Sequence, residues 1–192
     1  MPRYDAAHLR KRNMQLVFRE FRGGECLYGN EIARKTDISA PTVLKIIDFL
    51  LENRLIAEQE AAGTGVGRKP KLLSVDRQGH FSIGAVYEGE YLMLGLVDLN
   101  GDLQNFMQVK CGRDFEASLT QNVDRMLEIS KRDARDLAGI GIGIPCIYAA
   151  ASREITAPLL GIDRPRYFGD TVDAVAEKYG AGGVVDRSRL HT

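Results

Sequence analysis

The stretch of sequence that decides the fold runs from Gly29 to Leu73 and reads GNEIARKTDISAPTVLKIIDFLLENRLIAEQEAAGTGVGRKPKLL. Two helical patterns meet at a short turn over 36–38 and are followed by a Gly-rich, basic hairpin tip. A helix that can enter a groove, next to a flexible cationic loop, is what the reading of duplex DNA requires. The stretch therefore predicts a winged helix-turn-helix, with double-stranded DNA as its expected partner.

Three helices are expected in the first part of the chain. Apolar residues recur every three or four positions over 6–21, which predicts a helix there. Asn30 is expected to cap a short second helix over 31–35, and Ser39 is expected to cap a third. The core face of the third helix comprises Val43, Ile46, Ile47, Leu50 and Leu51.

The exposed start of the third helix is the expected reading surface. Its residues are small, hydroxylic or cationic, namely Ser39, Ala40, Pro41, Thr42 and Lys45. Pro41 costs little there, because the first backbone N–H groups of a helix have no helical partner. Thr42 could use its hydroxyl or methyl group on base edges, and Lys45 could reach guanine or phosphate. The alternative is that the hydroxyls only cap the helix and Lys45 is only solvated, and for each residue singly the two interpretations weigh about equally.

The wing is expected to consist of two short strands, over 55–57 and 71–73, and the loop between them. The loop residues expected at DNA are Thr64, Gly65, Gly67, Arg68 and Lys69. Glycine permits close approach to a sugar-phosphate wall, and Arg68 could enter a narrow minor groove. The alternative for a lone Gly-rich loop is a connector without fixed structure, but its place directly after a helix-turn-helix favours the wing.

The charge of the chain is balanced overall but not along its length. The formal net charge is zero, which by itself argues against a nucleic-acid binder. Residues 1–76 hold 13 Lys and Arg against 10 Asp and Glu, whereas residues 77–192 hold 13 against 16. A mildly basic first part before an acidic second part is consistent with a DNA-binding module joined to a domain of a different kind.

Cysteine use and the N-terminus indicate the compartment. Cys26, Cys111 and Cys146 are odd in number, far apart and not clustered with histidine, so neither a disulfide framework nor a zinc site is expected. The N-terminus lacks the apolar core of a signal peptide, and no apolar stretch is long enough to cross a bilayer. We therefore expect a cytoplasmic protein without a metal, a cofactor or a membrane partner.

A second domain is expected from residue 77 onward, where the pattern changes to strands. Alternating apolar residues predict strands over 81–87, 91–98 and 103–110, the last of them after an Asn-Gly turn signal. The remaining expected elements are a helix over 115–131, a Gly-rich strand over 137–145, a second helix and a short strand at 184–185.

Two details of this second domain are also expected. Asp170 is a possible cap of its second helix, and Gly180 marks the end of that helix. The glycines of the 137–145 strand are expected to let backbone pack closely on one face of the sheet. The fold class is therefore α/β overall: a mainly α winged helix-turn-helix over 1–76, followed by an α/β domain over 77–192.

Five segments, in this order, resemble the ROK family of repressors and sugar kinases, in its transcriptional-regulator branch. They are SAPTVLKIIDFLLENRLI (39–56), GVGRKPKLL (65–73), FSIGAVYEGEYLMLGLVDLNGDL (81–103), AGIGIGIP (138–145) and APLLGI (157–162). The resemblance implies a winged helix followed by an actin-like ATPase fold, of the ribonuclease H-like kind, in regulators that bind DNA as oligomers and respond to sugars. Family members are about twice as long, so this chain is expected to be truncated near the end of the first lobe.

Three departures from the pattern of the family's kinases argue against an enzyme. Where those kinases carry a phosphate loop resembling DIGGTK, Val86 replaces the aspartate and Glu88 replaces a glycine, so that like charges would repel ATP. Ser188 stands at the position of their catalytic base and cannot usefully accept a proton from a sugar hydroxyl. The segment over 157–162 lacks the asparagine and the aromatic residue with which the family contacts sugar.

The favoured function is a sequence-specific DNA-binding transcriptional regulator, a repressor of carbohydrate genes by resemblance. A homo-oligomer, as a dimer, is expected, together with a possible sugar effector whose site is incomplete. One alternative is a truncated interaction module that senses no ligand, since a lone first lobe exposes a sheet face or edge. A sugar kinase with an accessory DNA-binding domain is the least favoured alternative.

Overall fold

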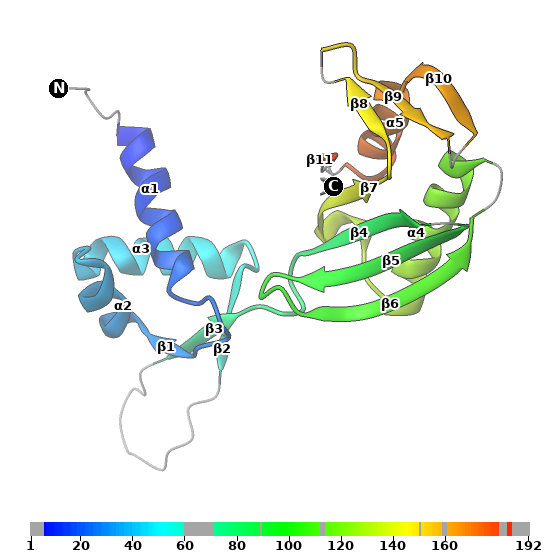
Figure 1. Cartoon of the computed structure of the whole chain (residues 1–192). Coiled ribbons are helices and arrows are strands. Elements are labelled where there is room, and N and C mark those ends of the chain that lie inside the picture. Colours follow the sequence, from blue (N-terminus) through cyan, green and yellow to red (C-terminus); the bar gives the residue numbers. More distant parts are fainter. Residues whose placement is uncertain are drawn as a thin grey trace. The chain divides into compact units, whose positions relative to one another are not determined.

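The computed structural model describes residues 6–59, 71–88, 90–111, 114–149, 151–158, 161–180 and 184–185 (Figure 1). The chain divides into two compact units, Met1–Gly79 and His80–Thr192. Each unit has its own hydrophobic core.

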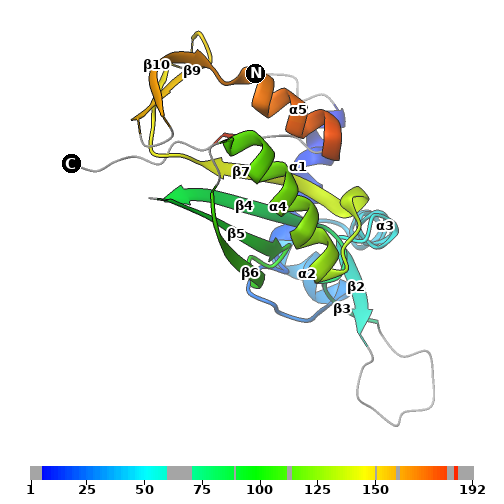
Figure 2. The same ribbon diagram turned by 90° about the vertical axis from the view of Figure 1, so that its right-hand side faces the viewer.

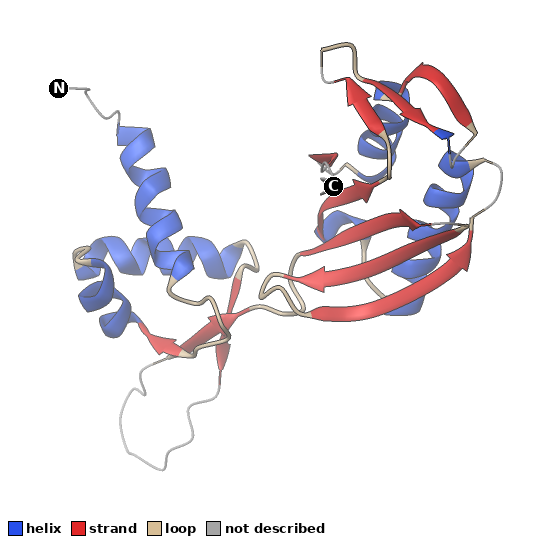
Figure 3. Cartoon of the chain, viewed as in Figure 1, coloured by secondary structure: helices blue, strands red, loops and turns tan. Residues whose placement is uncertain are grey.

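The first unit consists of three helices and three short strands (Figure 3). In chain order they are α1 (Ala6–Arg19), β1 (Leu27–Tyr28), α2 (Gly29–Thr36), α3 (Ala40–Glu52), β2 (Ile56–Gln59) and β3 (Leu72–Val75). The strands form one antiparallel sheet in the order β1-β3-β2. Helix, turn, helix and a strand pair on either side of residues 60–70 are the elements of the expected winged helix-turn-helix.

The core of the first unit joins the apolar faces of its helices to the sheet. Val17 and Phe21 from the first helical segment, with Ile32 of α2, are fully buried. Burying an aliphatic or aromatic side chain of this size contributes about 1.5–3 kcal/mol. The turn between α2 and α3 passes through Asp37 in the left-handed region, with φ 56°, a conformation that aspartate tolerates better than most residues. The core stripe and the turn therefore hold α3 at a fixed angle to α2.

The start of α2 differs from the prediction. The helix begins at Gly29, with Tyr28 as its N-cap, so Asn30 lies exposed in the first turn and does not cap. The Tyr28 N–H donates to Glu31 Oε2 at 2.9 Å, which satisfies a backbone donor that the helix itself leaves free. Strand pairing explains the shift, because Leu27 and Tyr28 are held in β1 against β3.

The second unit is built around a five-stranded mixed sheet. Its strands and helices are β4 (Phe81–Glu88), β5 (Tyr91–Asp98), β6 (Leu103–Lys110), α4 (Phe115–Ser130), η1 (Ala134–Asp136), β7 (Leu137–Gly143), β8 (Ile147–Ala149), β9 (Glu154–Ala157), β10 (Ile162–Tyr167), α5 (Gly169–Tyr179) and β11 (Val184–Val185). The sheet order is β11-β7-β4-β5-β6, with β7 parallel to both of its neighbours and the other pairs antiparallel. The α/β fold class is confirmed.

Helices α4 and α5 lie on the same side of this sheet (Figure 2). The core there joins alternate residues of β4, β5 and β7 to apolar side chains of the two helices, among them Ile83, Leu94, Ile140, Leu119 and Val175. On the opposite face the expected close packing at the glycines of β7 is seen at one position and not at another, since a Cβ built on Gly143 would lie 3.3 Å from Val86 Cγ2, whereas Gly141 has open space around it. A Cβ built on Gly84 or Gly141 meets no other atom of the described chain within 4 Å.

Two further features of the second unit depart from the prediction. A small antiparallel sheet, β10-β9-β8, follows β7 where no strands were expected. Phe168, not Asp170, is the N-cap residue of α5. Gly180 ends α5 as expected, in the left-handed region with φ 62°.

Candidate nucleic-acid interface

Helix α3 turns one face into the core of the first unit and presents the other to solvent. Val43, Ile46, Ile47 and Leu50 are buried, at the spacing that one face of a helix requires. The exposed positions on its first half are Ala40, Pro41, Leu44 and Lys45. Of the five predicted residues, Ala40, Pro41 and Lys45 are exposed on α3, Ser39 is exposed directly before it, and Thr42 is half-buried.

Hydrogen bonds define the start of α3. The Ser39 carbonyl oxygen accepts from the N–H groups of Thr42 at 2.9 Å and Val43 at 3.0 Å, which places Ser39 at the N-cap. Its hydroxyl makes no capping bond to the backbone and instead pairs with Thr42 Oγ1 at 2.8 Å. Since one hydroxyl of such a pair donates, the other keeps its hydrogen for an outside acceptor. The two hydroxyls form a small donor and acceptor unit at the tip of α3.

Charge along the exposed face of α3 changes sign from one end to the other. Lys45 lies in the first half and is exposed, whereas Asp48 and Glu52, also exposed, lie further along. Phosphate groups attract the lysine and repel the carboxylates, so the N-terminal half is the half that can approach DNA. Pro41 occupies the first turn, where no backbone N–H is lost from the helix.

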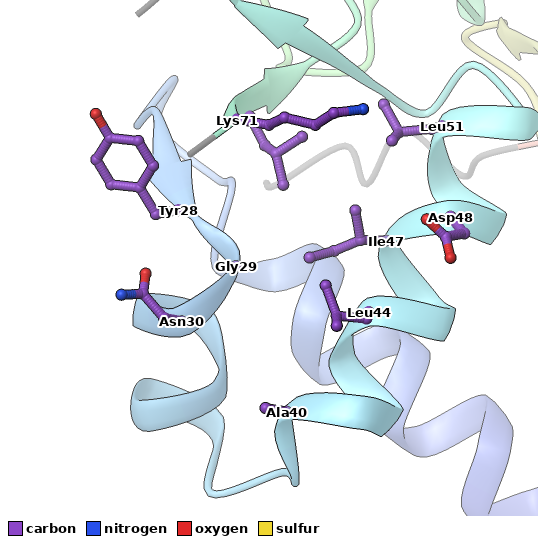
Figure 4. Close-up of a pocket in the computed structure, with 10 residues that line it drawn as sticks. Tyr28, Gly29, Asn30, Ala40, Leu44, Ile47, Asp48, Leu51 and Lys71 are labelled. Carbon is purple, nitrogen blue, oxygen red and sulfur yellow. The ribbon is translucent and has the colours of Figure 1, made fainter. Parts of the chain in front are cut away.

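Two hollows flank α3. One, here called the wing-side hollow, has a volume of about 470 Å³ and lies between α3, the start of α2 and β3 (Figure 4). It is lined by Tyr28, Gly29, Asn30, Ala40, Leu44, Ile47, Asp48, Leu51, Lys71 and Leu73. The other, on the α1 side, is lined by Leu9, Arg10, Asn13, Met14, Thr42, Lys45, Ile46 and Phe49. The helix is therefore a ridge between two depressions, the shape that insertion into a groove needs.

The described part of the wing is its base. Strand β2 pairs with β3 from Ile56 opposite Val75 to Gln59 opposite Leu72. Lys71 forms an ion pair with Glu58 across the two strands, which reduces its availability to phosphate. The predicted loop residues Thr64, Gly65, Gly67, Arg68 and Lys69 lie outside the described residues.

Leu44 is a residue of this surface that the sequence pattern missed. It lies between two core positions, and its side chain is 57% exposed on the wall of the wing-side hollow. The sequence did contain a signal for the exposure of Leu44, because it lies outside the i, i+3, i+4 stripe of buried residues. A leucine one position after Val43 points away from the core.

The second unit shows the expected departures from kinases where the structure describes them. Val86 and Glu88 lie at the end of β4, and both side chains are exposed. Val86 stands against Gly143 of β7, 3.3 Å from where a Cβ would be. Ser188 and the central residues of the 157–162 segment lie outside the described residues.

A buried carboxylate and a half-buried thiol of the second unit lie in environments that suit a structural role. Asp98 is buried and accepts hydrogen bonds from Asn100 N, Asp102 N and Gln104 Nε2 at 2.7–3.0 Å, which fixes the β5–β6 turn. Burial raises the pKa of the Cys146 thiol, which disfavours a reactive thiolate. Among the described residues, no group of His, Cys, Asp and Glu could hold a metal ion. None of the helices in the described ranges has the length and apolarity to span a membrane.

Comparison with known proteins finds a xylose repressor and a putative xylose repressor that are similar to this chain. The chain is 24% identical over 152 residues to the xylose repressor of Caldicellulosiruptor bescii, which is 77% of this chain and 38% of the repressor. It is 24% identical over 146 residues to a putative xylose repressor of a Caldicellulosiruptor species, 73% of this chain and 37% of that protein. No protein-family model matches the chain.

Among solved structures, the chain is similar to a ROK family transcriptional regulator described as a homologue of the Escherichia coli MLC protein. The TM-score is 0.67 at 16% identity, over 94% of this chain and 46% of that one. The chain thus spans less than half the length of the relatives that it matches. The resemblance expected from the five sequence segments is confirmed, and the fold is shared over nearly the whole chain.

Proposed function

We propose that this chain, which has the fold of a ROK family transcriptional regulator, is a sequence-specific DNA-binding regulator that represses carbohydrate genes. The observation that carries the proposal is the exposed first half of α3, a ridge with one cation and two paired hydroxyls between two hollows. Two xylose repressors among its relatives support the carbohydrate connection. Because a regulator of transcription binds the chromosome, we also propose that the protein is located in the cytoplasm.

Each proposed contact has its own role. Lys45 would bind a guanine edge or a phosphate, and the Ser39–Thr42 hydroxyl pair would bind a base edge or backbone oxygen. Ala40 and Pro41 are small enough to let the helix tip approach the floor of the groove. In the loop, Arg68 and Lys69 would neutralise phosphates, while Thr64, Gly65 and Gly67 would let the backbone come close.

We propose that the second unit performs no phosphoryl transfer and needs no cofactor. Val86 and Glu88 at the end of β4 support this, because an apolar side chain and a carboxylate there oppose a nucleotide phosphate. A sugar effector would therefore act by binding alone. ATP-dependent phosphorylation of a sugar by the purified chain would contradict this proposal and support the kinase alternative.

An exposed sheet face favours association between copies of the chain. Val86, Leu103 and Phe106 lie on the face of the five-stranded sheet opposite α4, and Phe106 is 59% exposed. Contiguous exposed apolar groups of this kind mark interaction surfaces. We propose a homodimer that binds two-fold symmetric DNA. A strict monomer that binds no palindromic DNA would instead support the interaction-module alternative.

Selection of bound sequences from random duplex DNA tests the proposal directly. The purified chain should enrich a defined motif, and Lys45→Ala should weaken binding to it. The expected loss is about 1–3 kcal/mol if Lys45 binds a base, or a salt slope smaller by about 0.9 if it binds a phosphate. Lys110→Ala, which removes the same charge from β6 of the other unit, is the control. Recovery of no motif, or equal losses for both variants, would reject the proposal.

A further inference from the structure

Leu44 forms part of a continuous apolar wall on α3. Its side chain stands one helical turn from Ala40, and both line the wing-side hollow with Ile47 (Figure 4). Leu51 and Leu73 continue the apolar lining away from the tip of the helix. A single exposed leucine is ordinary on a protein surface, but a leucine on the wall of a hollow beside the proposed reading surface is not isolated.

The two flanks of the α3 tip differ in chemistry. Thr42 and Lys45 line the α1-side hollow, whereas Ala40 and Leu44 line the wing-side hollow. Consecutive positions 44 and 45 thus place an apolar and a cationic group on opposite flanks of the same turn. A helix with such a tip can make polar contacts on one side and apolar contacts on the other at the same time.

Duplex DNA has one apolar group that a helix in the major groove can meet, the C5-methyl group of thymine. We propose that Leu44, with the methyl group of Ala40, recognises a thymine methyl in the operator and so determines specificity at that base pair. This inference rests on the proposed function, since it assumes that the tip of α3 enters the major groove. Lys45, exposed on the opposite flank, supplies the attraction to phosphate that brings the apolar wall to the bases.

Replacement of thymine by uracil removes the methyl group and leaves base pairing unchanged, so it isolates this contact. One buried methyl group contributes about 0.8 kcal/mol, which corresponds to roughly a fourfold change in affinity. The chain should therefore bind about fourfold more weakly to a selected operator that carries uracil at the recognised position. Uracil at thymines elsewhere in the operator should change the affinity by less than about twofold.

The test titrates operator duplexes, each with one thymine replaced by uracil, against the wild-type chain and Leu44→Ala at one salt concentration. Leu44→Ala should bind the thymine and uracil duplexes equally well at the recognised position, while it still distinguishes the operator from random DNA. Ile129→Ala is the control, because Ile129 is a 54% exposed aliphatic residue of α4, on the other side of the sheet from the proposed dimer face. This variant should keep the full effect of uracil.

Three outcomes overturn the inference. If no single uracil weakens binding of the wild-type chain, no thymine methyl is recognised, and this result needs no variant that folds. If Leu44→Ala keeps the same uracil effect as wild type, another residue makes the contact. If the chain binds no duplex at all, the proposed function fails and the inference fails with it, whereas the first two results leave the proposed function intact.

Discussion

At Gly79 a single hydrogen atom in place of a side chain permits the turn that leads out of β3. A Cβ at this position would lie 2.0 Å from the Arg54 carbonyl oxygen, far inside any van der Waals contact. The turn itself is closed by the Gly79 N–H, which donates to the Asp76 carbonyl oxygen at 3.2 Å. Arg54 lies one residue beyond Asn53, the C-cap of α3, so this close approach connects the end of the proposed recognition helix to the end of the sheet.

Gly79→Ala should therefore destabilise the first unit. The added methyl group can be accommodated only by movement of backbone, at a cost of about 1–3 kcal/mol, which is typical of overpacking. Amide hydrogen exchange measures the effect locally, and the amides of α3 should exchange about 5- to 150-fold faster than in wild type.

Gly84→Ala provides the control for this prediction. A Cβ at Gly84 meets no other atom of the described chain within 4 Å, and Gly84 has no positive φ. Alanine there should change stability by less than about 0.5 kcal/mol, or increase it slightly, because it restricts the unfolded chain. Equal hydrogen-exchange protection of α3 in Gly79→Ala and wild type would show that the turn adapts freely.

At the scale of elements, Tyr179 connects α5 to α4. Its hydroxyl donates at 2.8 Å to Asp124 Oδ1 and lies 3.0 Å from the Thr120 carbonyl oxygen, which can only accept. Lys178 forms a second link between the same helices, with Asp124 Oδ2 at 2.7 Å. Burial and the hydrogen bond to Asp124 raise the pKa of Tyr179 to about 12.

Tyr179→Phe should cost about 1–2 kcal/mol at neutral pH, because it removes the hydroxyl and leaves its partners less well satisfied. The difference in the free energy of unfolding between wild type and Tyr179→Phe should also depend on pH. A pKa raised in the folded state adds stability that is complete below about pH 10 and is lost as pH rises toward 12. Urea unfolding of both proteins from pH 8 to pH 12 should therefore show this difference in stability becoming smaller above pH 10.

A constant difference across that range would contradict the assignment of the pH dependence to Tyr179. Tyr91→Phe is the control, because Tyr91 of β5 is a more exposed tyrosine, and it should differ little from wild type in stability at any pH.

The elements that could be predicted from the sequence are those whose apolar period is long or strictly alternating. Strand β4 buries every second residue from Phe81 to Tyr87, and α3 carries its stripe over about two turns, from Val43 to Leu50. Strand β1 was missed because two residues hold no period, and β10 because its sequence, IDRPRY, is mostly exposed and contains a proline. Tertiary pairing, not local pattern, creates these strands.

The candidate site was predictable only in part for a related reason. The position of Lys45 on the exposed turn follows from the helical period alone. The pairing of the Ser39 hydroxyl with Thr42 does not, because a serine at an N-cap ordinarily bonds to a backbone N–H. Leu44 becomes visible as a surface feature only once β3 and the start of α2 are in place beside it, since they form the other walls of the hollow.

At the scale of the whole molecule, the distribution of charge favours the first unit as the one that would bind DNA in the proposed function. Residues 1–76 carry an excess of three positive charges, 13 against 10, and residues 77–192 an excess of three negative charges, 16 against 13. Within the described part of the first unit, two cations, Lys35 and Lys71, already have carboxylate partners. Lys35 lies 3.3 Å from Glu25 and 3.8 Å from Glu20, and Lys71 pairs with Glu58. Phosphate attraction in the proposed complex therefore depends on the other cations of this unit, which include Lys45 and the proposed wing pair Arg68 and Lys69.

The double variant Arg68→Ala, Lys69→Ala should weaken binding to every duplex by a similar factor, because contacts to the sugar-phosphate backbone carry no sequence information. Each phosphate that a cation neutralises contributes about 0.9 to the slope of log affinity against log salt, so loss of both cations should flatten that slope by about 1–2. The measurement is a salt titration on the selected operator and on random DNA.

The matched control removes two cations from the second unit, Lys110→Ala with Lys131→Ala, and should leave the slope unchanged to within about 0.3, well below the effect of one phosphate. If the wing variant and the control variant gave the same slope as wild type, the loop would not contact DNA, and α3 alone would account for binding. If the wing variant instead lost affinity for the operator but not for random DNA, Arg68 would read the minor groove of a particular sequence, because only a base or shape contact distinguishes the two. Backbone contact and base or shape contact by the loop are separable in one experiment, since loss of the first changes the slope on all DNA, whereas loss of the second changes only the ratio between operator and random sequence.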